Sequence, residues 1–206
     1  MVLFNVLGVV LNRLAVGYGN NELAAAGVVL KLERFPQNIA LGVCLGMVPT
    51  VAYNYARKDY KRMDRFFFAA FVWVMAIGLI STALFYFLRE SLVRIFIDND
   101  EVVAIGSKLL KARSLSVPFM AFGFLIVNFM QSVNRGQHSF LLCIVRHIVL
   151  SIPLLIIFNA AWGMDGLVWS QLVADGVNAI VSLLVYIRVH KKITKDTASV
   201  QMGSNS

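Results

Sequence analysis

The sequence is poor in charged residues and in cysteine, and these shortages exclude several classes of protein. Only 15% of its 206 residues are charged and 59% are hydrophobic, so the chain does not resemble a soluble globular domain. Cys44 and Cys143 both lie inside apolar runs, where a thiol usually packs as a small hydrophobe, so we expect neither a disulfide nor a metal pair. Metal-ligand clusters, phosphate-binding glycine loops and nucleophile–base constellations are also missing from the sequence. We therefore predict a protein that is not an enzyme and that needs no cofactor.

Long apolar runs dominate what is present. The mean hydropathy is +0.74, and about 20 apolar residues suffice for one helical span, so the chain has room for about six spans. We predict an all-α integral membrane protein with one transmembrane lobe over residues 1–188 and a disordered cytoplasmic tail over residues 189–206. The six predicted helices cover residues 1–19, 22–55, 66–88, 102–134, 140–161 and 167–186.

The charges between these runs predict the orientation of the lobe. The gaps at 56–65 and 135–138, together with the C-terminal segment 188–206, carry ten Lys and Arg residues and three acids. The opposite gaps, at 20–22, 89–113 and 163–166, carry five Lys and Arg residues and six acids. By the positive-inside rule, both termini are expected to be cytoplasmic in a multi-pass protein of the cell membrane. The basic residues do not form a periodic face with interleaved aromatics, so we expect no nucleic-acid partner.

The second run carries charged residues at a depth where they are costly. Lys31, Glu33 and Arg34 lie near its middle, and Glu33 is roughly 16 Å from its outer end at 1.5 Å per residue. Charges at such depth are expected to face protein or water, and they mark a candidate functional site. Lys31 and Arg34 share a face, whereas Glu33 points elsewhere and should have its partner on another helix. Pro36 follows directly and predicts a hinge in the helix.

Polar residues on later helices are expected near the same level. Arg146 and Asp175 lie within the fifth and sixth predicted spans, and Asn128 and Gln131 lie toward the end of the fourth. We interpret Glu33 and Asp175 as the proton- or cation-coupling acids, and Asn128 and Gln131 as polar residues of a cavity. The alternative is that these groups only hold helices together, for example through a pair of Glu33 with Arg146 and interhelical hydrogen bonds of the amides.

Three segments resemble the C-terminal lobe of transporters of the multidrug and toxic compound extrusion (MATE) family. ELAAAGVVLKLERFPQNIALGVCLGMVPTVAYNYARKDYKRM is similar to the second helix of that lobe. FMQSVNRGQ and GMDGLVWSQLVADGV resemble the ends of its fourth and sixth helices. The resemblance extends over about residues 1–190, and each motif is weak by itself, but their order and spacing agree.

The resemblance implies a six-helix lobe that pairs with a second lobe around a central cavity. It implies export of organic, often cationic compounds in exchange for H+ or Na+ by alternating access, with Lys31, Arg34 and Arg146 beside the coupling acids. Some sodium-coupled members carry acids on the first and fourth helices of this lobe, and the buried segments of this chain do not. The N-terminal lobe is absent, so the chain is expected to be a fragment or a half-transporter.

Two other functions remain open from the sequence. The first is a lipid-linked oligosaccharide flippase, because related families share the architecture and the intramembrane basic residues outnumber the acids. The second is a membrane interaction subunit that does not transport, because a single lobe offers one wall of a cavity. The chain by itself is expected to be unstable or to form a parallel dimer that covers its mid-membrane charges.

Overall fold

The computed structural model describes residues 9, 17 and 19–203, except for the side chains of residues 164–165, 167–168 and 194–203. The predicted first helix, residues 1–19, therefore lies almost entirely outside the described residues. In the described part 91% of residues are helical and no strand occurs. Four described helical segments are long and apolar enough to cross a membrane, or five if one bent pair counts as a span. The all-α membrane architecture is thus confirmed, whereas a count of six spans is not.

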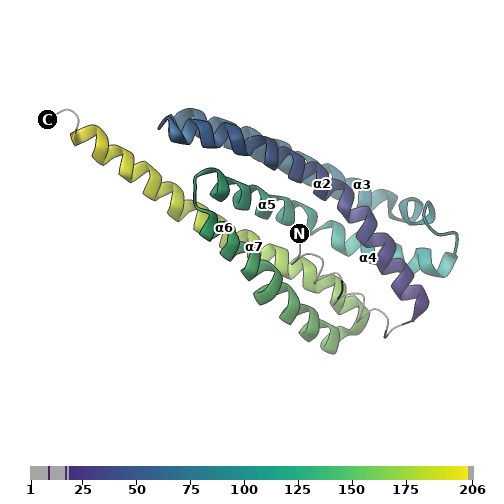
Figure 1. Ribbon diagram of the computed structural model, residues 1–206. Coiled ribbons are helices and arrows are strands. Elements are labelled where there is room, and N and C mark those ends of the chain that lie inside the picture. Colours follow the sequence, from purple (N-terminus) through teal and green to yellow (C-terminus); the bar gives the residue numbers. More distant parts are fainter. Residues whose placement is uncertain (1–8, 10–16, 18, 204–206) are drawn as a thin grey trace.

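The helices form an elongated bundle in which α2 (Asn20–Ala56) and α3 (Tyr60–Arg94) run side by side (Figure 1). Both are longer than their predicted spans, and α2 remains one helix through Pro36 and Pro49. The short link between α2 and α3 favours a tight antiparallel pair. Asp59 in this link caps α3, because its side chain accepts a hydrogen bond from the Arg62 amide.

The predicted single helix over residues 102–134 is wrong, because the chain breaks in its middle. The structure has α4 (Asp100–Ser114) and α5 (Val117–Ser132), bent by 47° relative to each other. Pro118 lies in the first turn of α5, where its missing N–H costs nothing. Asn99 caps α4, and acidic residues in the first turn and basic residues in the last turn complement the helix dipole.

The last third of the chain is nearly continuous helix with two irregular points. It comprises α6 (Gly136–Ile144), the π-helix η1 (Val145–Ser151) and α7 (Ile152–Gly203). Gly163 has a φ of 59° and reverses the chain inside α7, so the predicted turn at 163–166 is present and separates spans 136–163 and 169–193. The backbone of α7 is helical to Gly203, whereas the sequence predicts a disordered tail.

Two apolar clusters form the core at opposite ends of the bundle. The α4 cluster joins the first half of α2, the end of α3 and α4 around Val29, Val93 and Leu110. The α5 cluster joins the second half of α2, the start of α3, α5 and the end of α7 around Val51 and Phe129. Residues 33–39 of α2, 75–84 of α3 and 111–120 of α4 and α5 supply no buried residue to either cluster, and this level between the clusters carries the buried charges.

Candidate functional site

The buried charges gather between the two apolar clusters, in a level that we call the polar layer: Glu33, Arg113, Arg146, Gln171 and Asp175. They come from α2, α4, η1 and α7. The residues form two acid–base pairs, so the formal charges of the four ionisable members cancel. Three of its members, Glu33, Arg146 and Asp175, are charged residues that the sequence predicts near one level.

The first pair joins Glu33 of α2 to Arg113 at the end of α4. The guanidinium donates to both carboxylate oxygens, with Nη2 at 2.7 Å from Oε2 and Nε on Oε1. The two side chains are 13% and 10% exposed. Such a two-point contact is the strongest geometry for a carboxylate and a guanidinium. The suggested pair of Glu33 with Arg146 is therefore wrong, because Arg113 of α4 occupies the carboxylate.

The second pair joins Arg146 of η1 to Asp175 of α7 and is more deeply buried. Nη2 and Nε of Arg146 lie 2.8 and 3.0 Å from Oδ1 of Asp175, and the side chains are 6% and 1% exposed. Gln171, one turn earlier on α7, donates to Oδ2 at 3.1 Å. The Asp175 charge also acts on Arg113, which couples the two pairs electrostatically. Asp175 and Arg146, two of the predicted site residues, are thus in direct contact.

Both arginines lie at irregular points of their helices. Arg113 directly precedes the break between α4 and α5, where the freed Ser114 carbonyl accepts a hydrogen bond from Thr82 of α3 at 2.8 Å. Arg146 lies in the π-helix, and Ser151 donates to its carbonyl five residues earlier in the chain at 2.8 Å. Breaks and π-helical turns occur frequently at functional sites, because they let a helix change its local geometry.

The α7 face that carries Asp175 continues with further buried polar groups. Asn178 and Ser182 are 2% and 0% exposed, and the Asn178 Oδ1 and Ser182 Oγ atoms have no hydrogen-bond partner among the described residues. Gly123 of α5 makes room for this face, since a Cβ there would lie 2.8 Å from the Asn178 amide nitrogen. Unpaired buried oxygens are costly, so this stripe of α7 is a place where polar ligands or waters are expected.

Other predicted site residues lie elsewhere. Lys31 and Arg34 are exposed on α2 and form no ion pair among the described residues, in agreement with their predicted separation from Glu33. Asn128 is buried on α5, next to Phe129 of the α5 cluster, and donates to the Phe124 carbonyl of its own helix. Gln131 is exposed and donates to Ser139 of α6 at 3.1 Å. The structure does not bring either amide into contact with the two ion pairs.

Arg113 and Gln171 are the members of the polar layer that the sequence prediction missed. The charge pattern counts Arg113 within the gap at 89–113, on the side opposite the cytoplasm. A signal was available, because Val102, Gly106, Leu109 and Arg113 recur at helical spacing and form one buried face of α4. An arginine that continues an apolar stripe is expected to have a buried partner.

Comparison with known proteins gives a consistent result. The MatE family model matches residues 1–157. The multidrug export protein MepA of Staphylococcus saprophyticus is 29% identical over 202 residues, and MepA of Staphylococcus aureus strain MRSA252 is 28% identical over the same length. Each match covers 98% of this chain and 44% of the relative, so the chain spans less than half the length of these proteins.

Solved structures agree in fold. A crystal structure of MATE in the bent conformation superposes with a TM-score of 0.89 at 18% identity, covering 96% of this chain and 44% of that one. The Vibrio cholerae MATE transporter VcmN in the bent form gives 0.86 at 17% identity, covering 93% and 44%. The apolar spans and the relatives fit the prediction of a multi-pass membrane protein. With most of its length matched by the family model, the chain belongs to the MatE family, as the resemblance to multidrug and toxic compound extrusion transporters implied.

Proposed function

We propose that the chain forms one lobe of an exporter that moves organic, often cationic compounds out of the cell in exchange for H+ or Na+. The observation that carries this proposal is the polar layer, where two coupled acid–base pairs lie inside a MatE-family membrane lobe. A charge inside a membrane protein is costly unless it is paired or used. The multidrug export relatives favour drug export over lipid-linked oligosaccharide flipping.

The coupling mechanism follows from how each acid is held. Glu33 and Asp175 are neutralised by guanidiniums that sit beside a helix break and in a π-helix. A conformation that moves Arg113 or Arg146 away leaves a carboxylate without its cation in a low-dielectric interior. Such a carboxylate favours uptake of H+ or Na+. In this proposal cation uptake and the shape of the lobe change together, as alternating access requires. Solved MATE transporters include inward-facing and outward-facing forms.

The cavity lies on the exposed side of α2, against a second six-helix lobe. Lys31 and Phe35 are exposed on this side, and Cβ atoms at Gly42 and Gly46 would meet no atom of the described residues within 4 Å. Glycines four apart let another helix approach closely. The relatives are more than twice as long as the matched region, so a second lobe from the same or another polypeptide is the partner proposed for this face. Pro36 lies within this helix and is proposed as its hinge.

The proposed setting is the cell membrane with both termini in the cytoplasm, because the basic gaps of the sequence lie at that end. The substrate is a small organic cation or drug, and the coupling ion is H+ or Na+. No resident cofactor or metal is part of the proposal.

Dye efflux tests the proposal. The chain is joined behind the N-terminal half of the MepA relative and expressed in drug-sensitive cells, which are loaded with a fluorescent cationic dye. We expect active efflux that Glu33→Gln and Asp175→Asn each reduce at least tenfold at equal membrane abundance. Collapse of the proton gradient or removal of external Na+ then identifies the coupling ion.

The matched control is Glu90→Gln, which neutralises an exposed acid at the end of α3 and should leave efflux unchanged. Wild-type efflux in both polar-layer variants would show that these acids do not couple transport. A fusion protein that is correctly inserted in the membrane but exports no dye would contradict the assignment of this chain as an export lobe.

A further inference from the structure

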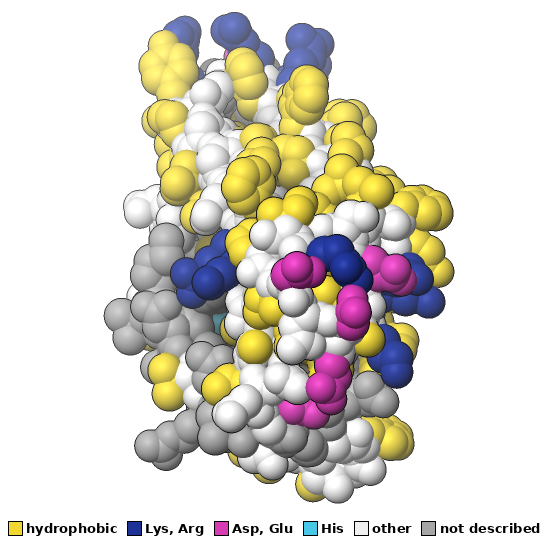
Figure 2. All heavy atoms as spheres, turned by 90° about the vertical axis from the view of Figure 1, so that its right-hand side faces the viewer, with side chains coloured by type: hydrophobic (Ala, Val, Ile, Leu, Met, Phe, Trp, Pro, Cys, Tyr) yellow, Lys and Arg dark blue, Asp and Glu magenta, His cyan; other side chains and the backbone are white. Residues whose placement is uncertain are grey.

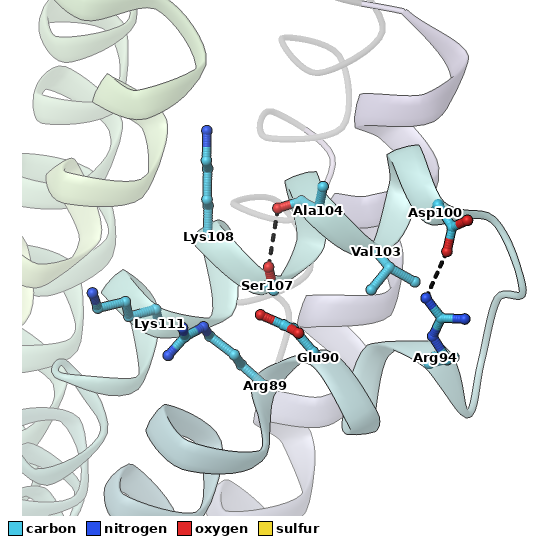
Figure 3. A pocket seen from close by; sticks show the side chains of 9 residues that line it. All are labelled: Arg89, Glu90, Arg94, Asp100, Val103, Ala104, Ser107, Lys108 and Lys111. Carbon is cyan, nitrogen blue, oxygen red and sulfur yellow. Dashed lines mark hydrogen bonds and ion pairs between the residues drawn. The ribbon is translucent and has the colours of Figure 1, made fainter.

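A second, charged site lies outside the polar layer, in a pocket between the end of α3 and α4. The pocket has a volume of about 500 Å³, within the range of small-molecule sites. Figure 3 shows charged side chains from both helices, with Arg89 and Glu90 on α3, Lys108 and Lys111 extending outward from α4, and Arg94 and Asp100 paired at one end. The lining residues are Arg89, Glu90, Arg94, Asp100, Val103, Ala104, Ser107, Lys108 and Lys111.

The pocket lies at the boundary between apolar and polar surface. The apolar run of α3 ends at Leu88 after 23 residues from Phe66, which is roughly the 30 Å thickness of a bilayer core, and Arg89 follows it. On the other wall, Lys111 lies four residues before Leu115, where the apolar run of α5 begins. Phe87 is 79% exposed beside this boundary. The end of the α3 run thus places Arg89 at headgroup depth, while Lys111 lies two residues before Arg113 of the polar layer, at the inner edge of the pocket.

The pocket has a surplus of unpaired positive charge. Arg94 is neutralised by Asp100, whereas Lys108 and Lys111 have no acidic partner within 4 Å among the described residues. Lys111 Nζ lies 5.2 Å from the centre of the Tyr86 ring, an arrangement that leaves its N–H groups available. Arg89 shares that ring and donates to the Tyr86 carbonyl. Glu90 is the one lining acid that is left to offset these three cations.

We propose that this pocket binds the phosphate of an anionic phospholipid headgroup. Arg89, Lys108 and Lys111 would hold the phosphate by charge-assisted hydrogen bonds. The exposed apolar surface of α3 and α5 beside the pocket would contact the acyl chains. Figure 2 shows this arrangement in outline, since basic and acidic side chains gather on the end of the bundle that faces the viewer and hydrophobic side chains border them. The site is separate from the polar layer, so it does not depend on transport.

Native mass spectrometry of the full 206-residue chain tests the proposal, with phosphatidylglycerol and phosphatidylcholine as probes in detergent. Basic residues near an anionic surface contribute about fivefold each in affinity. We therefore expect preferential retention of phosphatidylglycerol, weakened about 25-fold by Lys108→Gln with Lys111→Gln and about fivefold by Lys108→Gln alone. The charge-matched control, Lys61→Gln with Lys191→Gln at the other end of the bundle, should change retention by less than twofold.

Three results would overturn the site. The first is equal retention of both lipids, and the second is unchanged retention in the double variant. The third is binding of free glycerol phosphate as strongly as phosphatidylglycerol, which would assign the pocket to a soluble anion rather than to a lipid. The single lysine variant keeps the test decisive if the double variant does not insert correctly.

Discussion

Removing one partner of the deepest ion pair should be far more damaging than removing both. Asp175→Asn leaves the Arg146 guanidinium without its counter-charge, in a place where the two side chains are 6% and 1% exposed. An uncompensated buried charge costs about 3–5 kcal/mol. The Asn side chain still offers an oxygen to Gln171, so the loss comes from the charge rather than from that hydrogen bond. Arg146→Met should cost a similar amount, because it isolates the carboxylate.

The double variant, Arg146→Met with Asp175→Asn, removes both charges and leaves neither buried alone. We expect the double variant to lose less unfolding free energy than the sum of the two single losses, by at least about 2 kcal/mol. This is the size of coupling seen for residues in one network. The nearby charge of Asp175 on Arg113 adds to the loss in the aspartate variant, so that single change should be the worse of the two.

Unfolding by sodium dodecyl sulfate in mixed micelles, followed by tryptophan fluorescence, measures these differences. Glu90→Gln is the control, since an exposed surface change is expected to remain within about 0.5 kcal/mol of the original chain. Single losses that add in the double variant, or an Asp175→Asn loss below about 1 kcal/mol, would refute the picture of a dry, charge-balanced polar layer.

Three further predictions concern packing, orientation and assembly. Gly78→Ala should lower the unfolding free energy by about 1–3 kcal/mol, because the new Cβ would lie 3.1 Å from the Pro118 Cα at the start of α5. Gly42→Ala meets open space among the described residues and should be neutral in the same unfolding assay. Cysteines placed at Lys61 and Asp98 in a cysteine-free background should react with a membrane-impermeant maleimide from opposite sides, with Asp98 labelled in intact cells; the reverse pattern would invert the topology. Gly46→Cys in the same background should crosslink if two copies of the chain pair through α2 in parallel, and a monodisperse monomer in detergent without crosslinking would contradict that dimer.

The break between α4 and α5 illustrates why the sequence prediction fell short there. A proline at position 118 is compatible with a kinked helix or with the first turn of a new one, and local patterns do not distinguish the two. The decision comes from α3, where Thr82 bonds to the carbonyl that the break sets free and Gly78 lets the start of α5 approach. Neither contact can be inferred from residues 102–134 alone.

The sequence by itself determined the class of protein and predicted which apolar runs carry buried charges. Apolar runs of membrane length must become helices in a bilayer, since each helix satisfies its own backbone hydrogen bonds, and charges inside such runs must turn away from lipid. The tertiary structure decided which charges meet. Several basic residues are predicted near the level of Glu33, and only the packing of α4 against α2 selects Arg113 as its partner. The π-helix and the turn at Gly163 bring Arg146 and Asp175 together, although they lie 29 residues apart in the chain. Pairing depends on how helices rotate and bend against one another, and that is settled by long-range contacts rather than by any local run of residues.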